Sequence, residues 1–172
     1  MIEMELIGVQ LEMPSNSPVL LLRESNSQGR VLPVVIDLPE AQAIGRGMDG
    51  VRTARPMTHD LMKNLLDTLG AKVVKVTVTE LVDRTFYAVI ELQTAGGESL
   101  EVSSRPSDAV ALAVRTQSPI FASEEVMDEA GQFLEGLSRT EDSGEVDEEV
   151  VEELVDEFKA FLDDISPEDF QN

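Results

Sequence analysis

The chain has 172 residues, a formal net charge of −21 and no cysteine. Because a domain typically contains roughly 100 to 200 residues, this length predicts one compact domain with an appendage. Hydrophobic residues make up 42% of the chain, which is enough to furnish a core. The lack of cysteine excludes disulfide bonds, thiolate nucleophiles and cysteine-ligated zinc.

The negative charge is concentrated toward the C-terminus. Residues 1–135 carry 11 basic and 20 acidic side chains, a net charge of −9, whereas residues 136–172 carry 2 and 14, a net charge of −12. A generic nucleic-acid-binding protein is expected to carry a basic stripe, and the sequence has no obvious one. Any binding of a phosphate backbone must therefore depend on a few local arginines.

The N-terminal sequence MIEMELIGVQLEMP places acidic side chains where a secretory signal has its basic region. The sequence also contains no apolar run of about 18 residues, the length that a membrane-spanning helix needs. We therefore expect a soluble cytoplasmic protein that has no membrane partner.

The first part of the chain is predicted to form strands. Alternating apolar residues indicate strands at 4–13, 19–23 and 30–36, the last two joined as a hairpin by a polar turn. The alternation slips near Gly8, where we expect a β-bulge. A helix is expected to begin around Pro39, a residue favoured in the first turn, and to end soon afterwards at the glycines that follow residue 44.

A second helix is predicted to start with Thr58 as its N-cap and to end at Gly70. Strands at 72–81, 85–93 and 99–103 follow with short connections, which predicts an antiparallel meander. The leucines expected to face the core from the second helix are Leu61, Leu65, Leu66 and Leu69.

The next helix is expected to begin at Pro106, and it is apolar on nearly all sides over residues 109–114, which predicts burial. Residues 120–121 are expected to form a short edge strand. Residues 123–130 resemble a capped helix, with a serine followed by acidic residues.

The body is predicted to span residues 1–135 and to be followed by two further segments. Residues 136–149 are polar and acidic, a composition typical of a solvated linker. Helical periodicity returns at 150–172, where we expect an amphipathic helix and a turn. The apolar residues on one face of this helix are Val150, Val151, Leu154, Val155, Phe158, Phe161, Leu162 and Ile165.

The single histidine, His59, is the first candidate for chemistry. It could transfer a proton as a general base, or act as one metal ligand beside carboxylates. The alternative is a histidine at a helix N-terminus that hydrogen-bonds to local backbone. Asp60 likewise has a structural explanation, because an acidic residue in a first turn is favoured by the helix dipole.

Arg105 and Asp108 form the second candidate, at the start of the apolar helix. With Arg105 as N-cap, Asp108 occupies the third helical position and could reach back to the cap N–H as a capping-box acid does. Arg105 would place a forked cation beside the free N–H groups of a helix N-terminus, an arrangement suited to binding an anion. A structural ion pair is the alternative.

Three predicted helix starts carry acidic residues, namely Glu40, Asp60 and Asp108. If these helix starts converge, the three carboxylates would supply oxygen ligands for Mg²⁺ or Mn²⁺. Arg55 and Arg105 would then meet phosphate oxygens. A metal, arginines and a histidine are the groups that phosphodiester hydrolysis needs.

Three segments form a recognisable pattern, namely RPMTHDL at 55–61, FYA at 86–88 and RPSDAVALA at 105–113. The two most specific motifs in them are R-P-x-T-H-D and R-P-S-D-A, which are far more informative together than singly. With this pattern the chain resembles the bifunctional nuclease family, and in particular its actinobacterial members. The resemblance covers roughly residues 4–135, and the acidic stretch and C-terminal helix also match.

The resemblance implies an α+β domain with a curved mixed or antiparallel sheet of about six to eight strands and three to four helices packed on it. It also implies a divalent-metal-dependent nuclease and a homo-oligomer, with a dimer as the first expectation. The residues that correspond to the family's motifs are Glu40, Arg55, Thr58, His59, Asp60, Arg105, Ser107 and Asp108.

The leading hypothesis is therefore a nuclease that hydrolyses DNA and RNA with little sequence selectivity and uses Mg²⁺ or Mn²⁺. The expected catalytic residues are His59, Asp60, Arg105 and Asp108. The expected substrate-binding residues are Arg55, Thr58 and Ser107. The expected metal ligands are Glu40, Asp60 and Asp108.

The first alternative is a non-enzymatic, homo-oligomeric interaction or regulatory protein. In that case the two motifs merely cap helices at a subunit interface, and the acidic tail binds a basic partner. A further alternative is that the tail mimics nucleic acid and inhibits the body.

Overall fold

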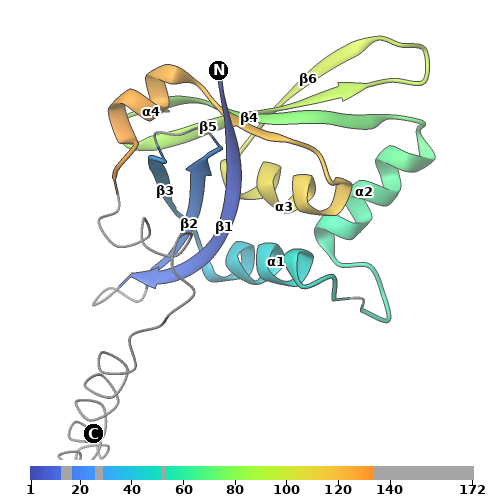
Figure 1. Ribbon diagram of the computed structural model, residues 1–172. Helices are drawn as coiled ribbons and strands as arrows, with labels where there is room; N and C mark the ends of the chain where they lie inside the picture. The colour runs from blue at the N-terminus through green and yellow to red at the C-terminus, as the bar shows by residue number, and fades with distance from the viewer. Residues whose placement is uncertain (13–16, 26–28, 52, 134–172) are drawn as a thin grey trace, which may run out of the picture. The chain divides into compact units, whose positions relative to one another are not determined.

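The computed structural model describes residues 1–12, 17–25, 29–51 and 53–133, in which seven strands form one mixed sheet accompanied by four helices (Figure 1). The predicted α+β class is confirmed. The predicted linker and C-terminal helix lie outside these residues.

The strands are β1 (Ile2–Glu12), β2 (Ser17–Glu24), β3 (Val31–Val35), β4 (Lys72–Val82), β5 (Thr85–Gln93), β6 (Ser99–Ser104) and β7 (Ile120–Ala122). The helices are α1 (Leu38–Met48), α2 (Thr58–Thr68), α3 (Pro106–Thr116) and α4 (Glu124–Ala130). In the described residues, no helix is both long and apolar enough to cross a membrane.

The strand order is β3-β2-β1-β7-β4-β5-β6. The predicted hairpin of β2 and β3 is confirmed, and β1 pairs antiparallel with β2. The register of that pairing shifts between Leu6 and Gly8, which confirms the predicted bulge. Gly8 has a φ of 152°, a backbone conformation that glycine adopts most readily.

The predicted meander of β4, β5 and β6 is also confirmed. Two residues, Asp83 and Arg84, connect β4 to β5, with positive φ values of 49° and 64°. Positive φ at both central positions is the geometry of a tight hairpin turn whose twist matches that of the strands. This turn places Arg84 immediately before β5.

The prediction that residues 120–121 form an edge strand is wrong, because β7 lies at the centre of the sheet. It pairs antiparallel with β1 and parallel with β4, and so joins the two halves of the sheet. Ile120 and Ala122 are buried accordingly. The segment's brevity suggested an edge, but this short strand pairs on both sides with longer strands.

Helix α3 is buried as predicted, and it packs against β4 and β5 while contacting both α1 and α2 (Figure 1). Helix α1 ends shortly before Gly50, as predicted, but the other two glycines that were expected to end it lie inside the helix. It continues through Gly45 and Gly47 to Met48. A Cβ on Gly47 would lie 2.9 Å from Nη1 of Arg115 on α3, so this glycine permits a close approach of the two helices.

The predicted apolar face of α2 is rotated relative to the observed one. Met62 and Leu66 pack against the core, whereas Leu61, Leu65 and Leu69 are at least half exposed. Helix α2 contacts α3 through the face that also carries His59, which is buried. The leucine spacing alone could not distinguish these two faces, since both carry apolar residues.

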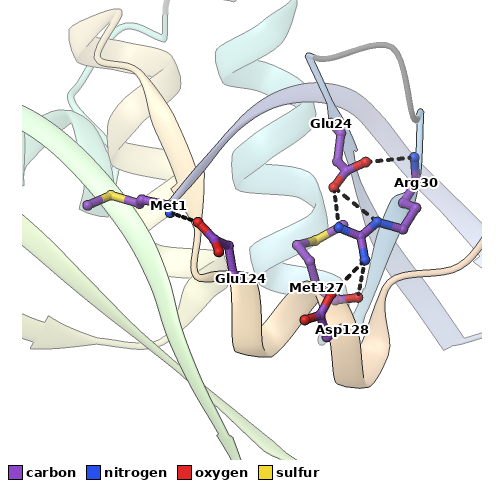
Figure 2. A network of polar contacts seen from close by, with 6 residues as sticks. All are labelled: Met1, Glu24, Arg30, Glu124, Met127 and Asp128. Atoms are coloured by element: carbon purple, nitrogen blue, oxygen red, sulfur yellow. Dashed lines mark hydrogen bonds and ion pairs between the residues drawn. The ribbon is translucent and has the colours of Figure 1, made fainter.

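A buried ion pair joins the β2–β3 hairpin to α4 (Figure 2). Glu24 is completely buried, and its Oε1 accepts a hydrogen bond of 2.7 Å from Nη2 of Arg30. Nη1 of Arg30 reaches the carboxylate of Asp128 and the backbone carbonyl of Met127. Arg30 therefore supplies the counter-charge of a completely buried carboxylate.

Candidate functional site

Four of the predicted site residues form one continuous network. They come from the first turns of α1 and α2, which supply Glu40 and His59, and from the start of α3, which supplies Arg105 and Asp108. Nη2 of Arg105 donates to Oε1 of Glu40 at 2.8 Å, and Nε donates to Oδ2 of Asp108 at 2.8 Å. The network joins three segments that are far apart in the sequence.

His59 completes the network, because its Nε2 lies 3.2 Å from Oδ1 of Asp108. The residue is only 7% exposed. A carboxylate can only accept a hydrogen bond, so this contact places the ring proton of neutral His59 on Nε2 and leaves Nδ1 with a lone pair. Within the described part of the chain, Nδ1 has no hydrogen-bond partner.

Asp108 departs from the capping role expected for it. It occupies the first turn of α3 behind the N-cap Arg105, yet its carboxylate contacts the Arg105 side chain and His59. Burial raises the pKa of Asp108, but the hydrogen bonds from Arg105 and His59 outweigh burial, so its pKa lies below the ordinary range. The hydrogen bonds that Arg105 donates to Asp108 and to Glu40 raise the pKa of Arg105. Both groups are charged at neutral pH.

Glu40 has one partner and one orphaned oxygen. Its Oε1 accepts from Arg105, whereas its Oε2 is buried and has no partner among the described residues. An ionised carboxylate oxygen without a donor is costly to bury. This oxygen is therefore the position in the network where an additional donor, such as water or a substrate hydroxyl, would be bound most favourably.

Asp60 lies in a separate interaction, although it is adjacent to His59 in the sequence. Its Oδ1 accepts a hydrogen bond of 2.6 Å from Nε of Arg115, and its Oδ2 accepts from the backbone N–H of Met57 at 3.0 Å. The Arg115 hydrogen bond holds the pKa of Asp60 below its usual range. Asp60 thus caps α2 and ties it to the end of α3.

The three predicted substrate-binding residues are placed differently. Arg55 and Thr58 are exposed, and the N-cap of α2 is Met57, one residue earlier than expected. Ser107 lies in the first turn of α3 and is only 5% exposed. None of the three belongs to the network of Glu40, His59, Arg105 and Asp108 among the residues described here.

Two arginines were not singled out in the sequence. Arg115, in the last turn of α3, is the partner of Asp60; a basic residue seven positions after Asp108 on a buried helix was the available signal. Arg84, in the β4–β5 turn, lines a cavity of about 320 Å³ beside Arg105. Its sequence context identified only the turn.

The residues do not fit the three-carboxylate site for Mg²⁺ or Mn²⁺ suggested by the sequence. Asp60 is occupied by Arg115, and the guanidinium of Arg105 bridges Glu40 and Asp108 at the position where a cation would be needed between them. Over the described ranges, no group of three or more acidic or histidine side chains is arranged to hold a metal ion. The positive charge that the structure places between these carboxylates is an arginine.

Comparison with known proteins identifies the family. The model of the bifunctional nuclease domain matches residues 20–135. An uncharacterized protein of Mycobacterium tuberculosis is 41% identical over 169 residues, which are 98% of each chain. Bifunctional nuclease 1 of Arabidopsis thaliana is 32% identical over 105 residues, which are 60% of this chain and 32% of the plant protein. Bifunctional nuclease 2 of the same plant is 31% identical over 112 residues, which are 63% of this chain and 34% of that protein. The alignments therefore span about a third of the plant proteins, and the chain belongs to the bifunctional nuclease domain family.

Proposed function

We propose that this domain hydrolyses phosphodiester bonds in DNA and RNA with little sequence selectivity. The observation that carries the proposal is the network of Glu40, Arg105, Asp108 and His59, which combines a cation with a buried histidine and two carboxylates. The names of the plant relatives, with which the chain shares its domain, support the same activity.

Arg105 is proposed to stabilise the negative charge that develops on the phosphate. Its Nε and Nη2 are held by Asp108 and Glu40, whereas Nη1 has no partner in the described structure. Because the side chain is 59% exposed, the N–H groups of Nη1 are available to a phosphate oxygen. Two carboxylate contacts fix the guanidinium before substrate binds, so little reorganisation is needed.

His59 is proposed to transfer the proton. Asp108 accepts from Nε2 and so holds the ring in the tautomer that has its lone pair on Nδ1. The aspartate of a serine-protease triad also fixes one tautomer of its histidine, but it accepts from Nδ1 and leaves the lone pair on Nε2. Nδ1 can then accept a proton from the attacking water, and Asp108 stabilises the imidazolium that forms. Asp108 acts here as a positioning residue, since its oxygens contact Arg105 and His59.

The cation requirement expected from the resemblance is a separate part of the proposal, and no step above depends on it. Assays with Mg²⁺, with Mn²⁺ and with a chelator test it directly. Residues 1–135 carry a net charge of −9, and few basic side chains lie at the site. We therefore expect binding of nucleic acid to be weak and salt-sensitive.

The test is cleavage of fluorescently labelled single-stranded DNA and RNA by the purified full chain, with each cation and with chelator. Glu40→Gln should reduce cleavage at least tenfold, because it removes the charge that orients Arg105. The matched control is Glu80→Gln, which changes an exposed glutamate on β4. Absence of cleavage by the wild-type protein under every condition would contradict the proposed activity.

The second candidate is a homo-oligomeric interaction protein, and one observation favours it. Helix α2 exposes Leu61, Leu65 and Leu69 along one face, an arrangement more common at subunit contacts than on a free surface. Light scattering on the wild-type protein and on Leu65→Gln tests it. A dimer that becomes monomeric in Leu65→Gln supports the candidate, and a wild-type monomer at micromolar concentration contradicts it.

A further inference from the structure

Beside the network lies a cavity of about 320 Å³ whose wall is formed by three separate segments. They are the end of β3 with the residues after it, the β4–β5 turn with the start of β5, and the first residues of α3. Arg105 lines this cavity and also belongs to the network, so the two sites share one side chain. The wall residues used below are Val35, Asp37, Arg84, Phe86, Arg105 and Ser107.

The polar groups around this cavity are mainly hydrogen-bond donors. Arg84 is exposed and forms no ion pair or hydrogen bond with any described residue. Nη1 of Arg105 likewise has no partner among the residues that the structure describes. Against these two arginines stands one exposed carboxylate, that of Asp37 at the N-cap of α1. The carboxylates of Glu40 and Asp108 are already bound to Arg105, so the free charged groups that line the cavity, two arginines and one aspartate, favour an anion.

Ser107 provides the second, independent indication of a ligand. It is only 5% exposed, it lines the cavity, and its hydroxyl makes no hydrogen bond within the described ranges. Its backbone N–H and that of Asp108 belong to the first turn of α3, whose N–H groups have no acceptor within the helix. Ser107 and the start of α3 therefore line the same cavity as the two arginines.

We propose that this cavity binds a phosphate group, with Arg84 as a phosphate-binding residue and Arg105, Ser107 and the N-terminus of α3 as its partners. The cavity is also lined by the apolar residues Val35 and Phe86, which suit the organic part of a phosphate ester. The inference deepens the proposed nuclease function and rests on it for the source of the phosphate, which is a nucleotide unit of the substrate. Arg105 then contacts the bound phosphate from the network side.

The test is calorimetric binding to the full chain at low salt, with a nucleoside 5′-monophosphate, the matching nucleoside and inorganic phosphate as separate ligands. The monophosphate should bind, the nucleoside should not, and tighter binding of the monophosphate than of inorganic phosphate identifies a nucleotide as the source. The proposal is overturned if the monophosphate and the nucleoside bind equally well. It is also overturned if neither the monophosphate nor inorganic phosphate binds. Tighter binding of inorganic phosphate overturns the nucleotide assignment.

Variants separate the proposed contacts from folding. Arg84→Gly removes the cation at a position whose φ of 64° suits glycine, so it should fold as well as the wild type. Arg84→Gly should weaken binding of the monophosphate roughly tenfold or more. Arg84→Lys should recover part of this loss of affinity, and Ser107→Ala should weaken binding less than Arg84→Gly does. The matched control, Arg46→Ala, removes an exposed arginine in the last turn of α1 and should bind as the wild type does.

Two combinations distinguish this inference from the proposed function. Phosphate binding that depends on Arg84, in a protein that cleaves no nucleic acid, supports the cavity assignment and overturns the nuclease proposal. Cleavage of nucleic acid with monophosphate binding unchanged in Arg84→Gly and Ser107→Ala overturns the cavity assignment alone.

Discussion

Nε2 of His59 lies 3.2 Å from Oδ1 of Asp108, although the two residues are 49 positions apart in the sequence. This contact joins the segment that contains His59 to the one that begins at Arg105, and thereby turns two short motifs into one site. Both residues lie in the first turns of their helices, α2 and α3. The contact also defines which nitrogen of the buried imidazole is free to take a proton.

Asp108→Asn should lower the free energy of unfolding by about 2 kcal/mol at pH 7. The substitution removes the negative charge and thereby weakens the hydrogen bonds that Asp108 accepts from His59 and Arg105. The pKa of Asp108 in the folded state lies below its unfolded value of 3.8. Its contribution to stability is therefore complete above that value and is lost as the pH falls through the folded pKa. Urea unfolding at pH 7 and at pH 3 measures this dependence.

Asp49→Asn is the control, since Asp49 is exposed at the C-terminal cap of α1. The difference in stability between the wild type and Asp108→Asn should narrow from pH 7 to pH 3, whereas Asp49→Asn should have little effect at either pH. A difference that widens at low pH would contradict the assigned direction of the pKa shift.

Arg115→Met should destabilise the fold without removing the proposed chemistry. It breaks the ion pair with Asp60 and a hydrogen bond to the carbonyl of Ala111. We expect a loss of about 2 kcal/mol, below the usual cost of breaking a fully buried pair because Asp60 is about one-third exposed. Urea unfolding gives the loss of stability, and cleavage per folded molecule should stay near the wild-type value. Full stability with abolished cleavage would instead assign Asp60 and Arg115 to the active site.

Two glycines in α1 provide a matched pair. Gly45→Ala places its Cβ in open space and should stabilise the protein by about 0.5 to 1 kcal/mol through helix propensity. Gly47→Ala gains the same propensity, but its Cβ would lie 2.9 Å from Nη1 of Arg115 and 3.1 Å from Cγ1 of Val114. In thermal unfolding, Gly45→Ala should have a higher melting temperature than Gly47→Ala. The reverse ranking would show that α1 and α3 are not packed closely at Gly47.

Glu24→Gln should lower the melting temperature, because it leaves Arg30 without its buried counter-charge (Figure 2). Glu5→Gln is the comparison, since Glu5 forms an ion pair with Arg23 while its side chain is 59% exposed. Circular dichroism melting should give a clearly larger decrease for Glu24→Gln than for Glu5→Gln. Equal decreases would mean that the buried pair contributes no more than a surface pair.

Most of the fold could be predicted from the sequence because its local signals are strong. Alternation identified the long strands, the slip near Gly8 identified the bulge, and Pro106 located the start of the buried helix. The errors occurred where tertiary contacts decide. The central position of β7 depends on pairing with β1 and β4, and the inward face of α2 depends on its contact with α3.

The sequence could predict which residues form the network of Glu40, His59, Arg105 and Asp108, but not the contacts between them. Helix-start motifs identified His59, Arg105 and Asp108, since charged residues in a first turn are visible in the sequence. The partner that each charge selects is a matter of three-dimensional proximity. Asp60 was therefore grouped with the other carboxylates, although the structure pairs it with Arg115.

The most direct measurement for the whole account is the rate of cleavage of labelled single-stranded DNA and RNA by wild type, Asp108→Asn and Asp49→Asn, each normalised to its folded fraction. Asp108→Asn should lower the rate at least a hundredfold, because it disturbs the orientation of both His59 and Arg105, and Asp49→Asn should match the wild type. Equal rates for Asp108→Asn and the wild type would contradict the assignment of this network as the site of phosphodiester hydrolysis.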